Sequence, residues 1–170
     1  MIDLTNHTLG KTDQLLEVDL KEDLQQLILT MSQQAKQRIL IFSHHLEQCL
    51  FDNDELYEAL KLLAIKNQRT HIHILLQDIK PITTKGHRLL KLARRISSHI
   101  SIKLTAKEHQ DIFETFLIFD NSAYILHTHP ERYDALGNFY DPLKTKHLSE
   151  QFEEIWQRGI VDSSLRRLSL

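Results

Sequence analysis

The order of apolar segments predicts an α/β sandwich in which a mixed sheet is flanked by helices. Two short runs of strand type, Arg38–Ser43 and His71–Gln77, each follow a segment whose apolar residues recur at helical spacing. Such strand–helix–strand units form right-handed crossovers between parallel strands. Two further strand-like runs, Ile112–Phe119 and Ala123–Thr128, are separated by a short polar turn and predict an antiparallel hairpin. The expected order is α-β-α-β-α-β-β-β-α.

The first two helices carry recognisable start signals. Asp19, with Glu22 three residues later, is typical of a capping box for a helix that begins near Leu20. For the second helix, Asp52 and Asn53 are both suitable N-caps. In both segments the apolar residues share one helical face, which predicts that each helix packs against the sheet.

The elements of the second half follow the same pattern less regularly. A third helix is predicted over Gly86–Ser98, after a loop that Pro81 is expected to interrupt. A strand over His99–Leu104 follows. The last helix is expected over His147–Arg158, after a long polar loop that includes Pro142.

Composition indicates one globular domain in the cytoplasm. The 170 residues are 41% hydrophobic, which suits a single core, and we expect residues 1–19 to form an N-terminal extension and residues 159–170 a C-terminal tail. The net charge of -2 gives no reason to expect nucleic acid or a membrane surface as partner. The single cysteine, Cys49, fits a reducing compartment. The polar N-terminus lacks the apolar segment of a signal peptide, and no apolar run approaches the ~20 residues of a transmembrane helix.

Several segments resemble the phospholipase D superfamily. The run Glu55–Asp78 is similar to the family's segment of a helix, a basic residue and a VRILLD-type strand. Ser43-His44 falls where the family often has a serine followed by an aromatic residue. The hairpin around Asp120 and the closing helix follow in the same order, so the resemblance covers about residues 20 to 158.

Two basic segments, Gly86–Ser98 and Leu165–Leu170, resemble more closely a bacterial domain that is similar to a single phospholipase D repeat and is sometimes attached to acetyltransferases. Relatives place two such units side by side across a shared cleft. The resemblance therefore implies a homodimer, and a protein partner associated with an acetyltransferase. The residues expected to face the cleft are Ser43, His44, Gly86, Arg88 and Asp120.

The same resemblance implies that the catalytic residues are missing. In the family, an H-x-K-x-x-x-x-D motif supplies a histidine that attacks phosphorus and a lysine that holds phosphate oxygens. Here Phe113 and Thr115 stand at the histidine and lysine places, and His127-Thr128 stands at a downstream Gly-Ser pair. Asp120 carries over, but an aspartate that opens a tight turn has its own structural reason to be there. We therefore expect no phosphodiester hydrolysis of the family type.

The 11 histidines leave a different reading open. His44, Asp120 and His127 are weak catalytic candidates for a phosphodiesterase or nuclease whose active site has moved. His127 and His129 lie two apart at a strand end, as zinc ligands can. However, zinc sites need three or four converging ligands, and no C-x-x-C or H-E-x-x-H spacing is present. We expect no metal and no cofactor.

A basic segment predicts an anion site. From Ile79 to Lys107 there are eight Lys and Arg residues and no Asp or Glu. The start of the predicted third helix would offer free N–H groups and the positive end of the helix dipole, which favour phosphate. It would also lie near Ser43-His44, at the carboxyl ends of neighbouring strands, where open α/β sheets bind ligands. The predicted ligand-binding residues are Ser43, His44, Lys85, Gly86, His87 and Arg88.

The alternative for this segment is an ordinary solvated face with salt bridges to Glu150, Glu153 and Glu154 of the last helix, or to an equivalent acidic segment. Taken together, the patterns predict a non-catalytic domain with a binding or regulatory role. Its expected partner is a phosphate-containing small molecule or a protein, and we expect no nucleic acid and no membrane.

Overall fold

A computed structural model of the chain describes residues 1–129 and 131–166, so the last part of the predicted tail lies outside the described residues. Its centre is a seven-stranded sheet with the order β1-β7-β6-β5-β2-β3-β4. The strands are β1 (Leu16–Val18), β2 (Arg38–Ser43), β3 (His71–Leu76), β4 (Ile100–Leu104), β5 (Thr115–Phe119), β6 (Ala123–His127) and β7 (Ala135–Asn138). β2, β3 and β4 run parallel, whereas β5, β6, β7 and β1 continue the sheet as antiparallel neighbours.

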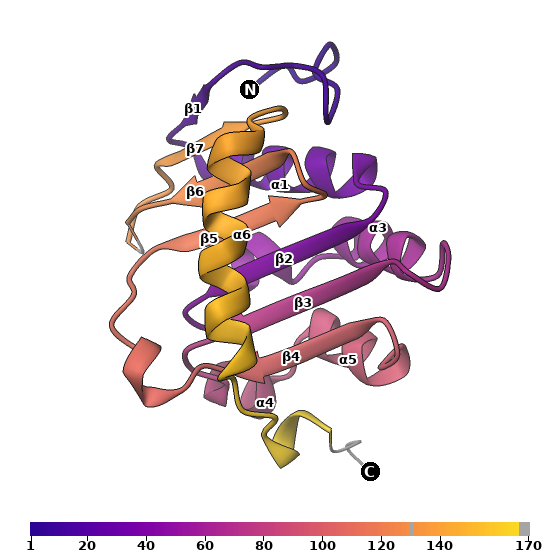
Figure 1. The fold of residues 1–170 in the computed structure, drawn as a ribbon, viewed down its shortest axis with the longest axis vertical. Coiled ribbons are helices and arrows are strands. Elements are labelled where there is room, and N and C mark those ends of the chain that lie inside the picture. The colour runs from indigo at the N-terminus through magenta and orange to yellow at the C-terminus, as the bar shows by residue number, and fades with distance from the viewer. Residues whose placement is uncertain (130, 167–170) are drawn as a thin grey trace.

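Helices cover both faces of this sheet unequally. The α-helices are α1 (Lys21–Gln34), α2 (Gln48–Phe51), α3 (Asp54–Ala64), α4 (Lys80–Lys85), α5 (Arg88–Arg95) and α6 (Pro142–Gln157), and two 3-10 turns are η1 (Lys107–His109) and η2 (Ser163–Leu165). Figure 1 shows α6 alone across the front of the strands, with α1, α3 and α5 behind them. Within the described residues, no helix is both long and apolar enough to cross a membrane. The expected α/β sandwich with a mixed sheet is confirmed.

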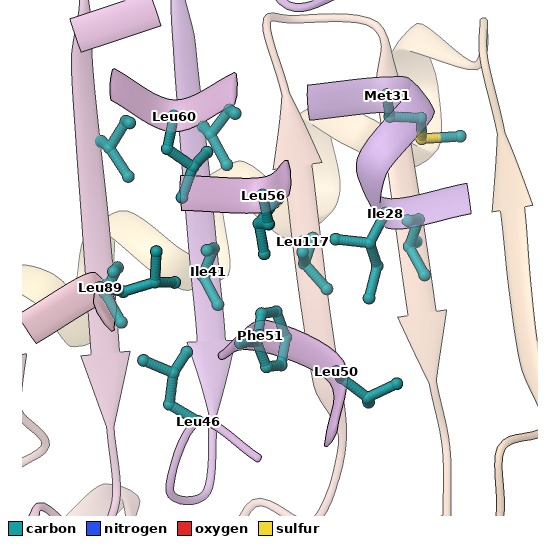
Figure 2. Close-up of a cluster of buried hydrophobic side chains, with 14 of the residues drawn as sticks. Ile28, Met31, Ile41, Leu46, Leu50, Phe51, Leu56, Leu60, Leu89 and Leu117 are labelled. Carbon is teal, nitrogen blue, oxygen red and sulfur yellow. The ribbon is translucent and has the colours of Figure 1, made fainter. Parts of the chain in front are cut away.

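The larger core lies between the sheet and the helices behind it. Figure 2 shows Ile28 of α1, Phe51 of α2 and Leu56 of α3 gathered around Ile41 and Leu117 of the sheet. Successive strand residues point to opposite faces, so the neighbouring Phe42 belongs to the other core, under α6. Because both faces are covered, the central strands are apolar at nearly every position, and this made them easy to predict.

Of the N-terminal caps predicted for the first two helices, one is confirmed and one is wrong. Asn53 caps α3, since its side chain accepts a hydrogen bond from Leu56 N at 2.9 Å. The predicted capping box at Asp19 is wrong, because the N-cap of α1 is Leu20 and no side chain caps it. Local capping is therefore not what starts α1.

Both prolines read as loop residues instead begin helices. Pro81 lies in the first turn of α4, and Pro142 begins α6, where Asp141 accepts a hydrogen bond from Lys144 N at 3.1 Å. The N–H groups of a first helical turn have no partners within the helix, so a proline there removes no helical hydrogen bond. The helix predicted over Gly86–Ser98 is therefore the shorter α5, and α4 precedes it as a helix that was not predicted.

Two edge-side strands, β1 and β7, were not predicted. β1 lies within the predicted N-terminal extension and pairs with β7. In β7, a Cβ on Gly137 would lie 2.9 Å from Leu27 Cδ2 of α1. Glycine therefore allows α1 to pack closely here, and the weak strand character of β7 is offset by its pairing with β6.

Candidate functional site

The candidate site lies at the edge of the sheet where β2 and β3 end and β5 begins. Ser43, the last residue of β2, pairs with Leu76 at the end of β3. β5 runs antiparallel to β2, so Thr115 at its start lies at this same edge, paired with His127 at the end of β6. This edge is on the left in Figure 1. It is the edge where open α/β sheets tend to bind ligands.

Ser43 shapes the loop at this edge. Its side chain is buried, and its Oγ accepts a hydrogen bond from Leu46 N at 3.1 Å. Leu46 has a φ of 63°, a conformation that is uncommon for a residue other than glycine. The Ser43 hydroxyl therefore holds a strained turn, and the exposed side chain after it is His44.

His44 is oriented by Gln77, the residue that follows β3. Its Nδ1 lies 3.0 Å from Gln77 Oε1, and Gln77 Nε2 donates to the carbonyls of His109 and Ile112 at 3.2 and 2.6 Å. With the amide nitrogen used in this way, Oε1 accepts the proton of His44 Nδ1. The exposed Nε2 of neutral His44 is then a base or hydrogen-bond acceptor. Gln77 also ties the loop before β5 to the site.

Lys85, Gly86 and His87 meet the loop after His44 in a small pocket. The rest of its wall is formed by His45, Leu46, Gln48, Pro81 and Ile82, and its volume is about 110 Å³. Gly86 has a φ of 81°, so the chain turns sharply between α4 and α5. The structure thus brings together three of the predicted ligand-binding residues beside the loop that carries His44.

His87 is the buried polar group of this pocket. It is 2% exposed, and its Nδ1 accepts a hydrogen bond from Leu89 N at 3.1 Å, so it caps α5. Burial lowers the pKa of His87, although the charge of Asp52 and a hydrogen-bonding contact with the backbone of Leu46 raise it. In the neutral ring, Nε2 therefore carries the proton. Within the described part of the chain, that Nε2 has no partner in regular hydrogen-bond geometry, and the backbone of Leu46 is another polar group that interacts with the ring.

Arg88 turns away from the pocket. Its backbone N donates to Asp52 Oδ1 at 3.0 Å, and its guanidinium pairs with Asp52 at 3.1 Å and Asp54 at 2.9 Å. These carboxylates raise the pKa of Arg88. The expectation of free N–H groups at this helix start is wrong at Arg88, because Asp52 already takes the place of an anion there. The alternative of a solvated face with salt bridges applies to Arg88, but its acidic partners are Asp52 and Asp54 and not the last helix, because α6 lies on the other face of the sheet.

Asp120 lies at the opposite edge of the sheet. Its carboxylate accepts hydrogen bonds from the backbone N of Lys36, Gln37 and Arg38, at 2.7 to 3.2 Å. The length of β5 separates Asp120 from Ser43. The prediction that Asp120 faces the same cleft as Ser43 is therefore wrong, and its contacts show a structural role in the turn.

His127 and His44 are held separately. His127 is buried, and its Nε2 is hydrogen-bonded to the carbonyl of Arg132. β5 lies between the strands that carry the two histidines. In the ranges 1–129 and 131–166, no group of three His, Cys, Asp or Glu side chains could hold a metal ion.

A family model matches nearly the whole chain, over residues 20–168. The chain belongs to the family described as a domain of unknown function (DUF7931). A comparison with curated proteins finds no match.

Solved structures show which fold this family has. NucT from Helicobacter pylori is 11% identical with a TM-score of 0.65, over 88% of this chain and 99% of NucT. Nuc from Salmonella typhimurium, a phospholipase D family member, is 15% identical with a TM-score of 0.61, over 86% of this chain and 95% of Nuc. Phosphatidylserine synthase from Haemophilus influenzae is 15% identical with a TM-score of 0.59, over 92% of this chain and 41% of the synthase. The chain therefore has the phospholipase D-like fold.

At the start of β5 the DUF7931 chain carries no side chain of the H-x-K type. Phe113 precedes the strand and is 77% exposed, and Thr115 is its first residue. Because its ring is exposed, Phe113 is not part of the core beside Ser43. Sequence reasoning missed Gln77 and His45 at this edge. Gln77 could have been found from the sequence, because it is a polar residue directly after the apolar end of a strand.

Proposed function

We propose that this DUF7931 chain is a non-catalytic phospholipase D-like domain with a binding or regulatory role, and that it binds a phosphate-containing small molecule in the pocket at His87. The observation that carries the proposal is the buried Nε2–H of His87, which has no partner in regular hydrogen-bond geometry among the described residues, in a pocket also lined by Lys85. Leaving a buried donor unpaired costs about 1–3 kcal/mol. A phosphate oxygen would satisfy this donor.

Lys85 supplies the charge that an anion needs. It is exposed, and no salt bridge to it occurs among the described residues. A pocket of about 110 Å³ has room for about three or four water molecules. This volume suits one phosphate group, with the rest of the ligand extending over the exposed loop that carries His44.

Isothermal titration with inorganic phosphate tests the proposal. We expect saturable binding by the wild-type chain, and about tenfold weaker binding by Lys85→Gln, since tenfold corresponds to the loss of about 1.4 kcal/mol. Lys80→Gln is the matched control, because it removes the same charge from the other end of α4, outside the pocket. Equal loss in both variants, or no binding by the wild type, would contradict the proposal.

The alternative is a phosphodiesterase or nuclease that uses His44, whose exposed Nε2 is a suitable base. It lacks the cation and nucleophile of the family pattern, since Thr115 and Phe113 stand in those places. In the same samples that bind phosphate, we therefore expect no turnover of a phosphodiester reporter. Turnover that His44→Ala removes would favour the alternative.

We further propose that two copies associate across the edge where β2 ends. The exposed ring of Phe113 supports this, because a large aromatic side chain on a protruding loop is typical of interface anchors. A protein partner joined to an acetyltransferase, as the sequence resemblance implies, stays a prediction.

A further inference from the structure

The outer edge of β4 is open along part of its length. β4 is the last strand of the sheet, and within the described chain its only main-chain bridge partner outside the sheet is Ile160. Leu104 and Ile160 exchange two hydrogen bonds, at 2.8 and 2.7 Å. Main-chain groups of alternate strand residues point to the same side, so the N–H and C=O of Ile102 also point to this outer edge. On the N-terminal side of Leu104, this outer edge has no paired strand among the described residues.

A pocket of about 500 Å³ lies along this open edge. α5, β4 and the C-terminal segment form its walls. Ala93, Ile102 and Val161 give it an apolar lining, and the cationic residues that line it are Arg94, Lys103 and Arg166. None of its lining residues is acidic. The basic segment of the sequence thus reaches the surface here, whereas Arg88 is neutralised elsewhere.

Arg94 holds the C-terminal wall in place. Its Nε donates to Leu165 O at 3.0 Å, and its Nη2 donates to Ser164 O at 2.7 Å. The chain after Ile160 is therefore drawn toward α5 and, among the described residues, pairs with Leu104 but not with Ile102, which is 7% exposed. Val161, on this segment, is 47% exposed at the pocket. Figure 1 shows the segment below β4.

We propose that the open edge of β4 receives an extended acidic peptide of a partner protein, which adds a strand to the sheet. An unpaired edge strand offers main-chain hydrogen bonds to such a peptide, and pockets beside it accept alternate side chains. Arg94 and Arg166, which line the pocket, complement acidic side chains. A second copy of this chain fits poorly, because antiparallel β4–β4 pairing would bring two sets of the same cations together.

A labelled peptide of alternating Glu and Val tests the inference by fluorescence anisotropy, with a Lys-Val peptide as the matched probe. We expect the Glu-Val peptide to bind at least tenfold more tightly, and Val161→Glu to weaken it about tenfold. Val161→Lys should bind it at least as well as the wild type. Leu143→Glu, on an 83% exposed residue of α6, introduces the same charge elsewhere and should change the affinity less than twofold.

Amide hydrogen exchange separates strand addition from loose electrostatic attraction. Exchange of the Ile102 amide should slow at least tenfold when the Glu-Val peptide binds. The inference is overturned by no binding, by binding that leaves Ile102 exchange unchanged, or by equal weakening in Val161→Glu and Val161→Lys. Protection of Ile102 that rises with protein concentration and without peptide would assign the edge to a second copy instead.

Discussion

The Asp120 carboxylate joins the hairpin between β5 and β6 to the start of β2. It accepts hydrogen bonds from three consecutive backbone N–H groups, those of Lys36, Gln37 and Arg38. In addition, Arg38 Nε donates a hydrogen bond to the Asp120 carbonyl at 3.2 Å. Asp120 itself has a φ of 56°, which aspartate and asparagine tolerate better than most residues. Two separate physical reasons thus favour this residue type, and neither involves catalysis.

Asp120→Ala should lower the free energy of unfolding by about 2 kcal/mol, because it removes charge-assisted acceptors and strains a positive φ. Asp120→Asn keeps one acceptor and tolerates the backbone, so we expect about half that loss. Urea denaturation measures both. A change of less than about 0.5 kcal/mol in Asp120→Ala would show that water replaces these contacts.

At the scale of elements, α6 is the one helix of the described chain on its face of the sheet, and aromatic stacking docks it. Trp156 stacks on His73 of β3, with ring centroids 4.2 Å apart and planes 5° apart. Lys103 Nζ of β4 lies 4.4 Å above the Trp156 ring and donates to the Trp156 carbonyl at 3.1 Å. The C-terminal end of α6 is therefore held against the sheet by the stack of Trp156 on His73 and by the contact with Lys103.

This docking should weaken in acid. Burial, followed by the charges of His71, Lys103 and Arg38, lowers the pKa of His73 to about 4. A histidine with a lowered folded-state pKa binds protons more readily when unfolded, so its contribution to stability is complete above pH ~6.5 and is lost as the pH falls toward 4.

The comparison of wild type with His73→Phe tests this pH dependence, because phenylalanine keeps the stack and does not titrate. Between pH 7 and pH 4.5, the stability of the wild type should fall more steeply than that of the variant. Trp156, the single tryptophan, provides the fluorescence signal for denaturant titrations. Parallel losses in the two proteins would rule out His73 as the group responsible.

The elements differed in how far they could be predicted from the sequence. β2 was found because both of its faces are buried and its apolar run is continuous, and β3 because it is apolar except at His71 and His73. α4 and the start of α6 were missed, because proline at a first helical turn was taken as a break. β7 contains Gly137, whose role becomes visible only when α1 packs against it. Where the local sequence pattern did not predict an element, pairing and packing between distant segments determine its structure.

For the molecule as a whole, parts of the site could be predicted and their grouping could not. Ser43-His44 and Lys85–His87 were named from strand ends and charge, and the fold brings the loop after His44 next to Lys85 and His87. Arg88 was misassigned, because its partners Asp52 and Asp54 approach from another helix. Such ion pairs between distant segments leave no local trace in a sequence.

Association of two copies is the expectation at this scale. If Phe113 anchors the contact, Phe113→Glu should shift the mass measured by light scattering from dimer to monomer. Leu143→Glu, which alters another exposed apolar residue, should leave the dimer unchanged. A wild-type monomer at high concentration would count against the proposed association.

The central claim is that the buried His87 donor and Lys85 form a phosphate site in a domain without the H-x-K residues. A phosphate titration followed through the Nε2 resonance of His87 tests it most directly. We predict a saturable shift of that resonance in the wild type and in Lys80→Gln, and a strongly weakened one in Lys85→Gln. A His87 resonance that stays unchanged while phosphate binds elsewhere would contradict the claim.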